Sequence, residues 1–142
     1  MAEKTSTPPL AGSKTSIEKT KKKTKVEVSQ HGRAYIIATF NNTLITLTNK
    51  DGDTISWGTS GSSGFKGTRK STPYAATVAV ENAVRKAIEK GLKTVDVYIK
   101  GPGSGRDSAL RAIRTGGLSI SLISDITPIP HNGPRPTKKR RI

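Results

Sequence analysis

The stretch TPYAATVAVENAVRKAIEKG, residues 72–91, decides the fold class because it places a helical pattern after a run of β-type segments. Thr72 followed by Pro73 is typical of a helix N-terminus, and Gly91 is typical of a C-terminal stop. Between these signals, apolar residues recur at the spacing of one helix face. This apolar stripe consists of Ala76, Val80, Ala83, Val84, Ala87 and Ile88. We therefore expect an amphipathic helix that packs its stripe against a sheet.

Three β-type segments precede that helix. Hydropathy alternates over residues 33–41, which predicts a strand. The residues expected on its inward face are Ala34, Ile36, Ala38 and Phe40. Turn-forming residues separate this segment from further expected strands over 43–48 and 54–57. Three short strands in succession predict an antiparallel meander.

The pattern after the helix returns to strand and then to helix again. Residues 95–99 alternate as a fourth strand, and Ser104 with Asp107 resembles a capping box that opens a second helix. A Gly-Gly pair ends that helix before a fifth strand over 118–122. The order βββαβαβ predicts an α/β domain with a mixed sheet, because right-handed crossovers make part of the sheet parallel and cover it with the two helices.

The charge of the chain indicates a polyanionic partner. Its 142 residues hold 25 Lys and Arg against 10 acidic residues, a formal charge of +15. Binding to such a partner depends strongly on salt. The chain has no cysteine, which removes disulfides, thiol nucleophiles and thiolate metal sites and fits a reducing cytosol. We expect no membrane span and no secretory signal, because no apolar run is long enough for either.

The composition also divides the chain into three parts. Residues 1–29 are rich in Lys, Thr, Ser and Pro, so we expect a basic N-terminal arm that is disordered when free. Residues 128–142 carry four prolines and five basic residues with no acid, which predicts an extended basic tail. The bland alternative for the tail is a solvated charge run. Residues 30–127 remain as an α/β domain, which we expect to bind RNA.

Two glycine-rich loops and the tail are the candidate binding segments. In residues 58–71, GTSGSSGFKGTRKS, glycines allow backbone amides to approach phosphate, and Lys66, Arg69 and Lys70 add charge. Phe65 suits either a base-stacking role or a packed loop anchor. The second loop, KGPGSGR over 100–106, predicts an anion-binding nest before a helix N-terminus. In a partly parallel sheet, both loops would lie at the same edge.

The residues offer little to an enzyme. The sequence contains no HExxH motif, no GxSxG motif and no His pair at metal spacing. His31 and His131 are expected outside the core elements, where a general base is poorly held. Asp96 and Asp125 are the acidic residues expected on strands, and they alone would suit a carboxylate-metal nuclease. We expect no catalysis, no resident metal and no cofactor.

Four blocks resemble a known family. They are FNNTLITLT (40–48), GSSGFKGTRKSTPYAA (61–76), KGPGSGRDSALRAI (100–113) and DITPIPHNGPRP (125–136). In order and spacing they are similar to the eleventh protein of the small ribosomal subunit, bacterial type, from about residue 33 to residue 142. Two departures are Pro134, where the family often has cysteine, and residues 1–29, which are longer and less family-like.

The resemblance implies a structural protein of the ribosome, not an enzyme, with a ribonuclease-H-like fold. It implies a place on the small-subunit platform, where the family bridges ribosomal RNA helices and helps form the messenger leader (Shine-Dalgarno) cleft. The implied protein neighbours are the seventh and eighteenth small-subunit proteins, and the family is linked to initiation factor three. We expect a cytoplasmic ribosome, while an organellar one stays open.

The resemblance and the loop chemistry together give the expected RNA-binding residues. They are Asn41, Asn42, Phe65, Lys66, Arg69, Lys70, Ser71, Lys100, Arg106, His131, Asn132, Arg135, Lys138, Lys139, Arg140 and Arg141. Asn132 precedes Gly133, whose unshielded amide favours succinimide formation, and the family associates this block with isoaspartate. Two other functions remain open: a free-standing RNA chaperone, which would bind many RNAs alike, and a nuclease of the same fold class.

Overall fold

The computed structural model describes residues 29–135 and 137–138, and it confirms an α/β fold with a mixed sheet and two helices. The elements in chain order are β1 (His31–Ala38), β2 (Thr43–Asn49), β3 (Thr54–Thr59), the 3-10 helix η1 (Gly67–Ser71), α1 (Pro73–Glu89), β4 (Thr94–Lys100), α2 (Gly105–Thr115) and β5 (Ser119–Asp125). The short helix η1 lies in a segment that the sequence predicted as loop. The expected N-terminal arm lies outside the described residues, except for Ser29.

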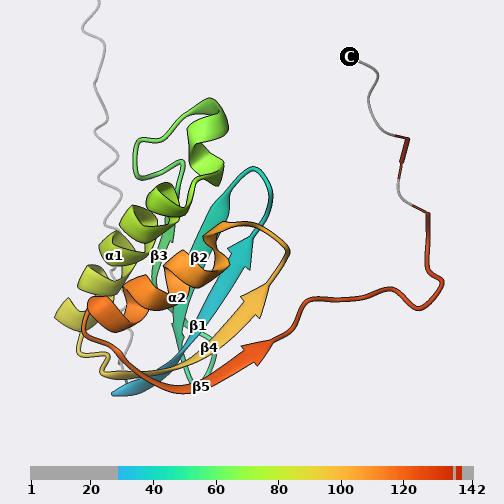
Figure 1. The fold of residues 1–142 in the computed structure, drawn as a ribbon. Coiled ribbons are helices and arrows are strands. Elements are labelled where there is room, and N and C mark those ends of the chain that lie inside the picture. The colour runs from blue at the N-terminus through green and yellow to red at the C-terminus, as the bar shows by residue number, and fades with distance from the viewer. Residues whose placement is uncertain (1–28, 136, 139–142) are drawn as a thin grey trace, which may run out of the picture.

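The sheet contains five strands in the order β3-β2-β1-β4-β5 (Figure 1). The pairs β1–β2 and β2–β3 are antiparallel, which confirms the predicted meander. The pairs β1–β4 and β4–β5 are parallel, as the two helical crossovers require. The C-terminal ends of β1, β3, β4 and β5 therefore point the same way.

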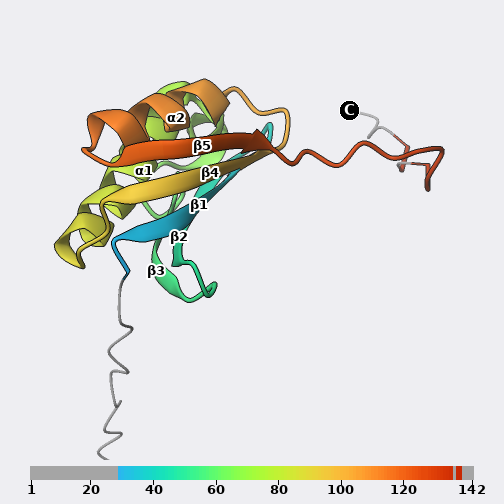
Figure 2. The ribbon, with the colours of Figure 1, turned by 90° about the horizontal axis from the view of Figure 1, so that it is seen from below.

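Both helices lie on one face of the sheet and pack against each other (Figure 2). The apolar stripe of α1 is buried as predicted, except that Ile88 is exposed. The largest fully buried apolar side chains come from both layers and their connections, and are Ile36, Ile45, Leu47, Val80, Val84, Leu92, Val95, Val97, Ile113 and Leu118. The core thus lies between one sheet face and the helices, and the other sheet face carries exposed residues such as Trp57.

Local chemistry places the ends of α1 where the sequence predicts them. Thr72 Oγ1 accepts a hydrogen bond from Ala75 N at 3.3 Å, and Pro73 occupies the first helical position. Gly91 has a φ of +100°, a left-handed conformation that glycine adopts without steric cost. The N-terminus of α1, at Thr72 and Pro73, lies at the same end of the sheet as the C-terminal ends of β1 and β4 (Figure 1).

Two expectations about β1 were wrong. Phe40 does not face inward, because β1 ends at Ala38 and the Phe40 side chain is 74% exposed. The strand ends there because Thr39 closes a turn, with its Oγ1 accepting from Asn42 N at 3.1 Å. His31 lies inside β1 instead of outside the core elements, and its Nε2 lies 3.0 Å from Asp96 Oδ2.

The expected capping box of α2 was also wrong. Ser104 precedes α2 but makes no side-chain capping bond. Its hydroxyl instead donates to the Ser71 carbonyl at 2.8 Å, in the loop before α1. Asp107 lies in the first turn of α2, where a negative charge is favourable.

The last strand is longer than its predicted span and contains a bulge. Val95 pairs with Ile120, but the next residue, Asp96, pairs with Leu122. The extra residue turns Leu122 away from the helices, and its side chain is 49% exposed. The strand continues to Asp125, three residues beyond the predicted end.

Candidate nucleic-acid interface

Three loops converge where the strands β1, β3 and β4 end. They are residues 39–42, 60–71 and 101–104, and we call them together the loop edge (Figure 1). Ser104 Oγ donates to Ser71 O at 2.8 Å, and Gly103 N donates to Ala38 O at 2.9 Å. These bonds join each loop to a neighbour, so the prediction that the two glycine-rich loops share an edge is confirmed.

The loop over 60–71 is held by its own short polar side chains. Thr59 N donates to Ser62 Oγ at 2.9 Å, and Ser62 N donates to Thr59 Oγ1 at 2.9 Å. Ser71 Oγ donates to Thr68 O at 2.8 Å within η1. Gly64 and Gly67 have positive φ angles that let the chain turn. The loop is therefore held in one conformation by its own hydrogen bonds. The hydroxyl of Ser71, an expected RNA contact, already donates its proton to the Thr68 carbonyl.

The basic residues of this loop point their charge to solvent. Lys66 and Arg69 are exposed, and Lys70 is half-buried with its aliphatic stem over Gly61. Such a stem packs on the protein while its ammonium group stays accessible. All three residues belong to the segment that leads into the N-terminus of α1, where the helix dipole favours an anion.

The aromatic residues at the loop edge differ from the sequence expectation. Phe65 is partly buried and meets Tyr74 edge to face, with ring centroids 5.9 Å apart. This contact favours the loop-anchor role for Phe65. Phe40 and Tyr74 are instead the accessible rings, 74% and 70% exposed. Sequence reasoning missed both, although Tyr74 lies off the apolar stripe of α1 and gave a usable signal.

The glycines of the second loop serve close packing more than anion binding. A Cβ atom at Gly101 would lie 2.3 Å from Ala38 O, and one at Gly103 would lie 2.4 Å from Thr39 O. The amides of both glycines already donate, Gly101 N to Thr127 Oγ1 and Gly103 N to Ala38 O. The expected nest therefore lacks two of its donors. Lys100, at the start of this loop, is exposed.

The guanidinium of Arg106 is engaged in hydrogen bonds within the protein. Its Nη1 donates to Gly101 O at 2.6 Å and to Thr127 Oγ1 at 3.3 Å, and its Nη2 pairs with Asp125 Oδ2. Asp125 Oδ1 also accepts from Thr127 N at 2.9 Å. This network joins α2, the second loop and the residues that follow β5. Arg106 is thus a tertiary contact, which its position in a basic loop did not reveal.

The network determines the acidity of Asp125. The Thr127 hydroxyl, the Arg106 guanidinium and the Thr127 amide lower the pKa of Asp125 from 3.8 to about 2. Since the pKa is lowered on folding, the stability that Asp125 contributes is present above pH 4 and is lost as the pH falls toward 2. The network is therefore fully formed at neutral pH.

We expect Thr127→Val and Arg106→Ala each to raise the pKa of Asp125 toward its usual value, because each removes a hydrogen bond to the charged form. Titration of the Asp125 carboxyl carbon by NMR measures this shift. An unchanged Asp125 titration would contradict the network.

The described part of the tail leaves the domain as an exposed segment (Figures 1 and 2). His131, Arg135 and Lys138 are exposed, as is Asn132. Asn132 has a φ of 56°, a left-handed conformation that Asn tolerates better than most residues. The remaining expected contacts, Lys139, Arg140 and Arg141, lie outside the described residues.

The two strand carboxylates, Asp96 and Asp125, do not lie opposite each other. Asp96 pairs with Leu122 and Asp125 with Ile99, so the two carboxylates lie three residues apart along neighbouring strands. That offset corresponds to about 10 Å. No cluster of three His, Asp or Glu side chains with metal-binding geometry occurs in residues 29–135 or 137–138.

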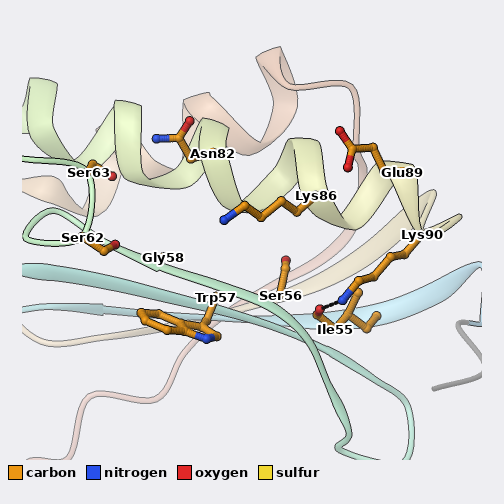
Figure 3. A pocket seen from close by; sticks show the side chains of 10 residues that line it. All are labelled: Ile55, Ser56, Trp57, Gly58, Ser62, Ser63, Asn82, Lys86, Glu89 and Lys90. Atoms are coloured by element: carbon orange, nitrogen blue, oxygen red, sulfur yellow. Dashed lines mark hydrogen bonds between the residues drawn. The ribbon is translucent and has the colours of Figure 1, made fainter. Parts of the chain in front are cut away.

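A separate groove of about 490 Å³ lies between β3 and α1 (Figure 3). Lys90 extends across it and donates its Nζ proton to the Ile55 carbonyl. Lys86 also points into the groove, while Glu89 adds an opposite charge. Lys90 therefore occupies one backbone acceptor of the edge strand β3 and places a charged side chain there, which disfavours pairing with another chain at that point.

None of the helices in the described part of the chain is long and apolar enough to cross a membrane. Exposed basic side chains on formed loops, beside a helix N-terminus and a basic tail, define a nucleic-acid-binding protein of the α/β class. The sequence profile described as Ribosomal protein S11 matches residues 32–141. The chain belongs to this family and is a structural, ribosomal RNA-binding protein of the small subunit.

Proposed function

We propose that the protein binds and bridges small-subunit ribosomal RNA helices on the platform and helps form the messenger leader (Shine-Dalgarno) cleft. The observation that carries this proposal is the exposed basic loop of Lys66, Arg69 and Lys70 at the loop edge, with Lys100 at the end of β4 and the basic tail starting at the same end of the sheet. A loop edge and a tail that diverge from one domain suit contacts with more than one RNA helix.

Phosphate contacts supply most of the binding in this proposal. Lys66, Arg69 and Lys70 approach one backbone segment, at the end of α1 where the helix dipole favours an anion. Lys100 and the tail residues reach a second. The exposed Asn41 brings a side-chain amide to the same edge, and Asn42 beside it is half-buried. An amide of this kind suits a ribose hydroxyl or a base edge.

Phe40 and Tyr74 are the proposed stacking residues. We expect Phe40→Ala and Tyr74→Ala each to weaken RNA binding by about 1–3 kcal/mol if a base stacks on the ring. Thermal unfolding should barely change in Phe40→Ala, because this side chain is mostly exposed, and should fall slightly in Tyr74→Ala, because that variant loses the ring contact with Phe65. Trp57→Ala is the matched control, since this ring is 60% exposed on the open sheet face, away from the loop edge. Filter binding with small-subunit ribosomal RNA measures all three, and equal affinities throughout would contradict stacking.

We infer a ribonuclease-H-like architecture from the strand order β3-β2-β1-β4-β5 with β2 antiparallel to its neighbours. The separation of Asp96 from Asp125 supports a binding role for this architecture. The proposed partners are the seventh and eighteenth small-subunit proteins, initiation factor three and the messenger leader. The proposed location is the cytoplasmic ribosome.

Sedimentation of the tagged protein from cell lysate tests the proposed function. We expect stable migration with small subunits through moderate salt. Migration as a free protein, with equal affinity for unrelated RNAs, would instead support a free-standing RNA chaperone. Loss of sedimentation in a Lys66→Ala, Arg69→Ala, Lys70→Ala variant would assign the association to the loop edge.

We also propose isoaspartate at Asn132. The amide of Gly133 is unshielded by a side chain, and Asn132 is exposed in a left-handed turn. Peptide mass spectrometry on protein from assembled ribosomes should find isoaspartate at position 132. A Gly133→Ala variant should keep Asn132 intact, because its methyl group hinders ring closure. An unmodified Asn132 in freshly isolated subunits would remove the proposal.

A further inference from the structure

The basic tail begins at a hydrogen-bonded joint. Ile126 N still donates to Ile99 O at 2.9 Å and so continues the sheet by one residue. Thr127 is the next residue, and its hydroxyl donates to Asp125 Oδ1 and accepts from Gly101 N at 3.1 Å. Residues 128–135 are all exposed. Thr127 is therefore the last described residue that ties the tail to the domain.

Arg106 completes this joint from the first turn of α2. Its guanidinium donates to Gly101 O, Thr127 Oγ1 and Asp125 Oδ2. These three acceptors belong to the second loop, the base of the tail and the end of β5. Since the guanidinium is planar and presents its donors as a fork, it fixes the relative orientation of these groups.

We propose that Arg106, Asp125 and Thr127 form a clasp that sets the direction in which the basic tail leaves the domain. On this view Arg106 is a positioning residue that contributes to RNA binding through the tail and makes no phosphate contact of its own. The inference rests on the proposed function, since it concerns how the protein holds ribosomal RNA.

Charge supports the positioning role over a direct contact. Asp125 neutralises Arg106, and its carboxylate would lie beside any phosphate that approached the guanidinium. Five basic residues follow the clasp in the tail. Fixing the exit direction at Thr127 raises the effective concentration of those charges near the RNA that the loop edge holds. Preorganisation of this kind increases affinity without any new contact.

The direction in which Asp125→Asn changes the RNA affinity distinguishes a positioning role of Arg106 from a direct phosphate contact. Asp125→Asn removes a negative charge, so a direct phosphate contact by Arg106 predicts tighter RNA binding. The clasp predicts weaker binding, by about tenfold, because the tail loses its fixed direction. Asp107→Asn is the matched control, since it removes the same charge one residue from Arg106 outside the clasp, and it should leave affinity unchanged or higher. Tighter binding by Asp125→Asn would overturn the proposal.

Arg106→Lys gives an independent test in case Asp125→Asn unfolds. Lysine keeps the positive charge but not the planar fork, so it should lose about as much affinity as Arg106→Ala. Wild-type affinity in Arg106→Lys would favour a simple phosphate contact and overturn the clasp. Thermal unfolding checks that each variant is folded.

Truncation shows whether the clasp acts through the tail. In a chain that ends at Pro128, Asp125→Asn should cause no further loss of affinity, because the segment that it positions is absent. A persistent tenfold loss in the truncated chain would contradict the proposal. Filter binding with full-length small-subunit ribosomal RNA measures every variant. Failure of the wild-type chain to bind this RNA would instead refute the proposed function.

Discussion

Raising the salt concentration from about 50 to about 200 mM should lower the affinity for small-subunit ribosomal RNA by roughly 10³ to 10⁵, as for proteins that neutralise about 6 to 10 phosphates. The described residues supply six exposed or half-buried basic candidates, which are Lys66, Arg69, Lys70, Lys100, Arg135 and Lys138. Filter binding across a salt series measures the slope of log affinity against log salt. A nearly flat dependence would contradict the electrostatic account.

Two triple variants that remove the same charge show which surface of the domain produces the salt dependence. The triple variant Lys66→Ala, Arg69→Ala, Lys70→Ala should reduce the slope by about 1 per removed phosphate contact. The control triple Lys50→Ala, Lys93→Ala, Arg114→Ala removes the same charge from the opposite end of the domain (Figure 1). Its slope should stay close to that of the wild-type chain. Equal losses in both triples would mean that net charge, and not the loop edge, determines binding.

The parts of the fold that the sequence predicts well are those set by local chemistry. Thr72 and Pro73 begin α1, and Gly91 follows its C-terminal end. The hydrogen bond and the dihedral angles that set these ends involve residues only a few positions apart. The mixed sheet also follows from the element order, because a helix between two strands forces a parallel crossover. Periodicity does not say which sheet face each helix covers, and here both cover the same face.

In each failure a side-chain hydrogen bond overrides the repeating pattern, within a local turn for Phe40 and between distant residues for Ser104 and Arg106. Phe40 continues the alternation of β1, but the Thr39 hydroxyl closes a turn before it. Ser104 has the spacing of a capping residue, but its hydroxyl bonds to Ser71, 33 residues away. Arg106 looks like a phosphate contact, but Asp125 lies 19 residues on and pairs with it. Sequence spacing carries no information about such partners.

The glycines of the second loop pack closely against backbone at the loop edge. The sequence alone predicts an anion-binding nest for them. Gly101 has a φ of +100°, and a Cβ there would lie 2.3 Å from the Ala38 carbonyl oxygen. Gly52, in the β2–β3 turn, has a φ of +98° and no atom within 4 Å of its Cβ position. The two glycines share the same backbone conformation and differ in what surrounds them. A comparison of alanine substitutions at the two positions therefore separates the cost of a positive φ from the cost of close packing.

We expect Gly101→Ala to destabilise the protein far more than Gly52→Ala. Both variants place an alanine at positive φ, which costs roughly 1–2 kcal/mol. Gly101→Ala also forces Cβ against backbone that has no side-chain freedom to move, which adds about 1–3 kcal/mol of overpacking. Urea unfolding monitored by Trp57 fluorescence measures both free energies. Because Gly101 joins Ala38 to the clasp, its variant should also weaken RNA binding under folding conditions, whereas Gly52→Ala should not. Equal losses of stability would show that the loop yields to the new methyl group, and that the second loop does not depend on this packing.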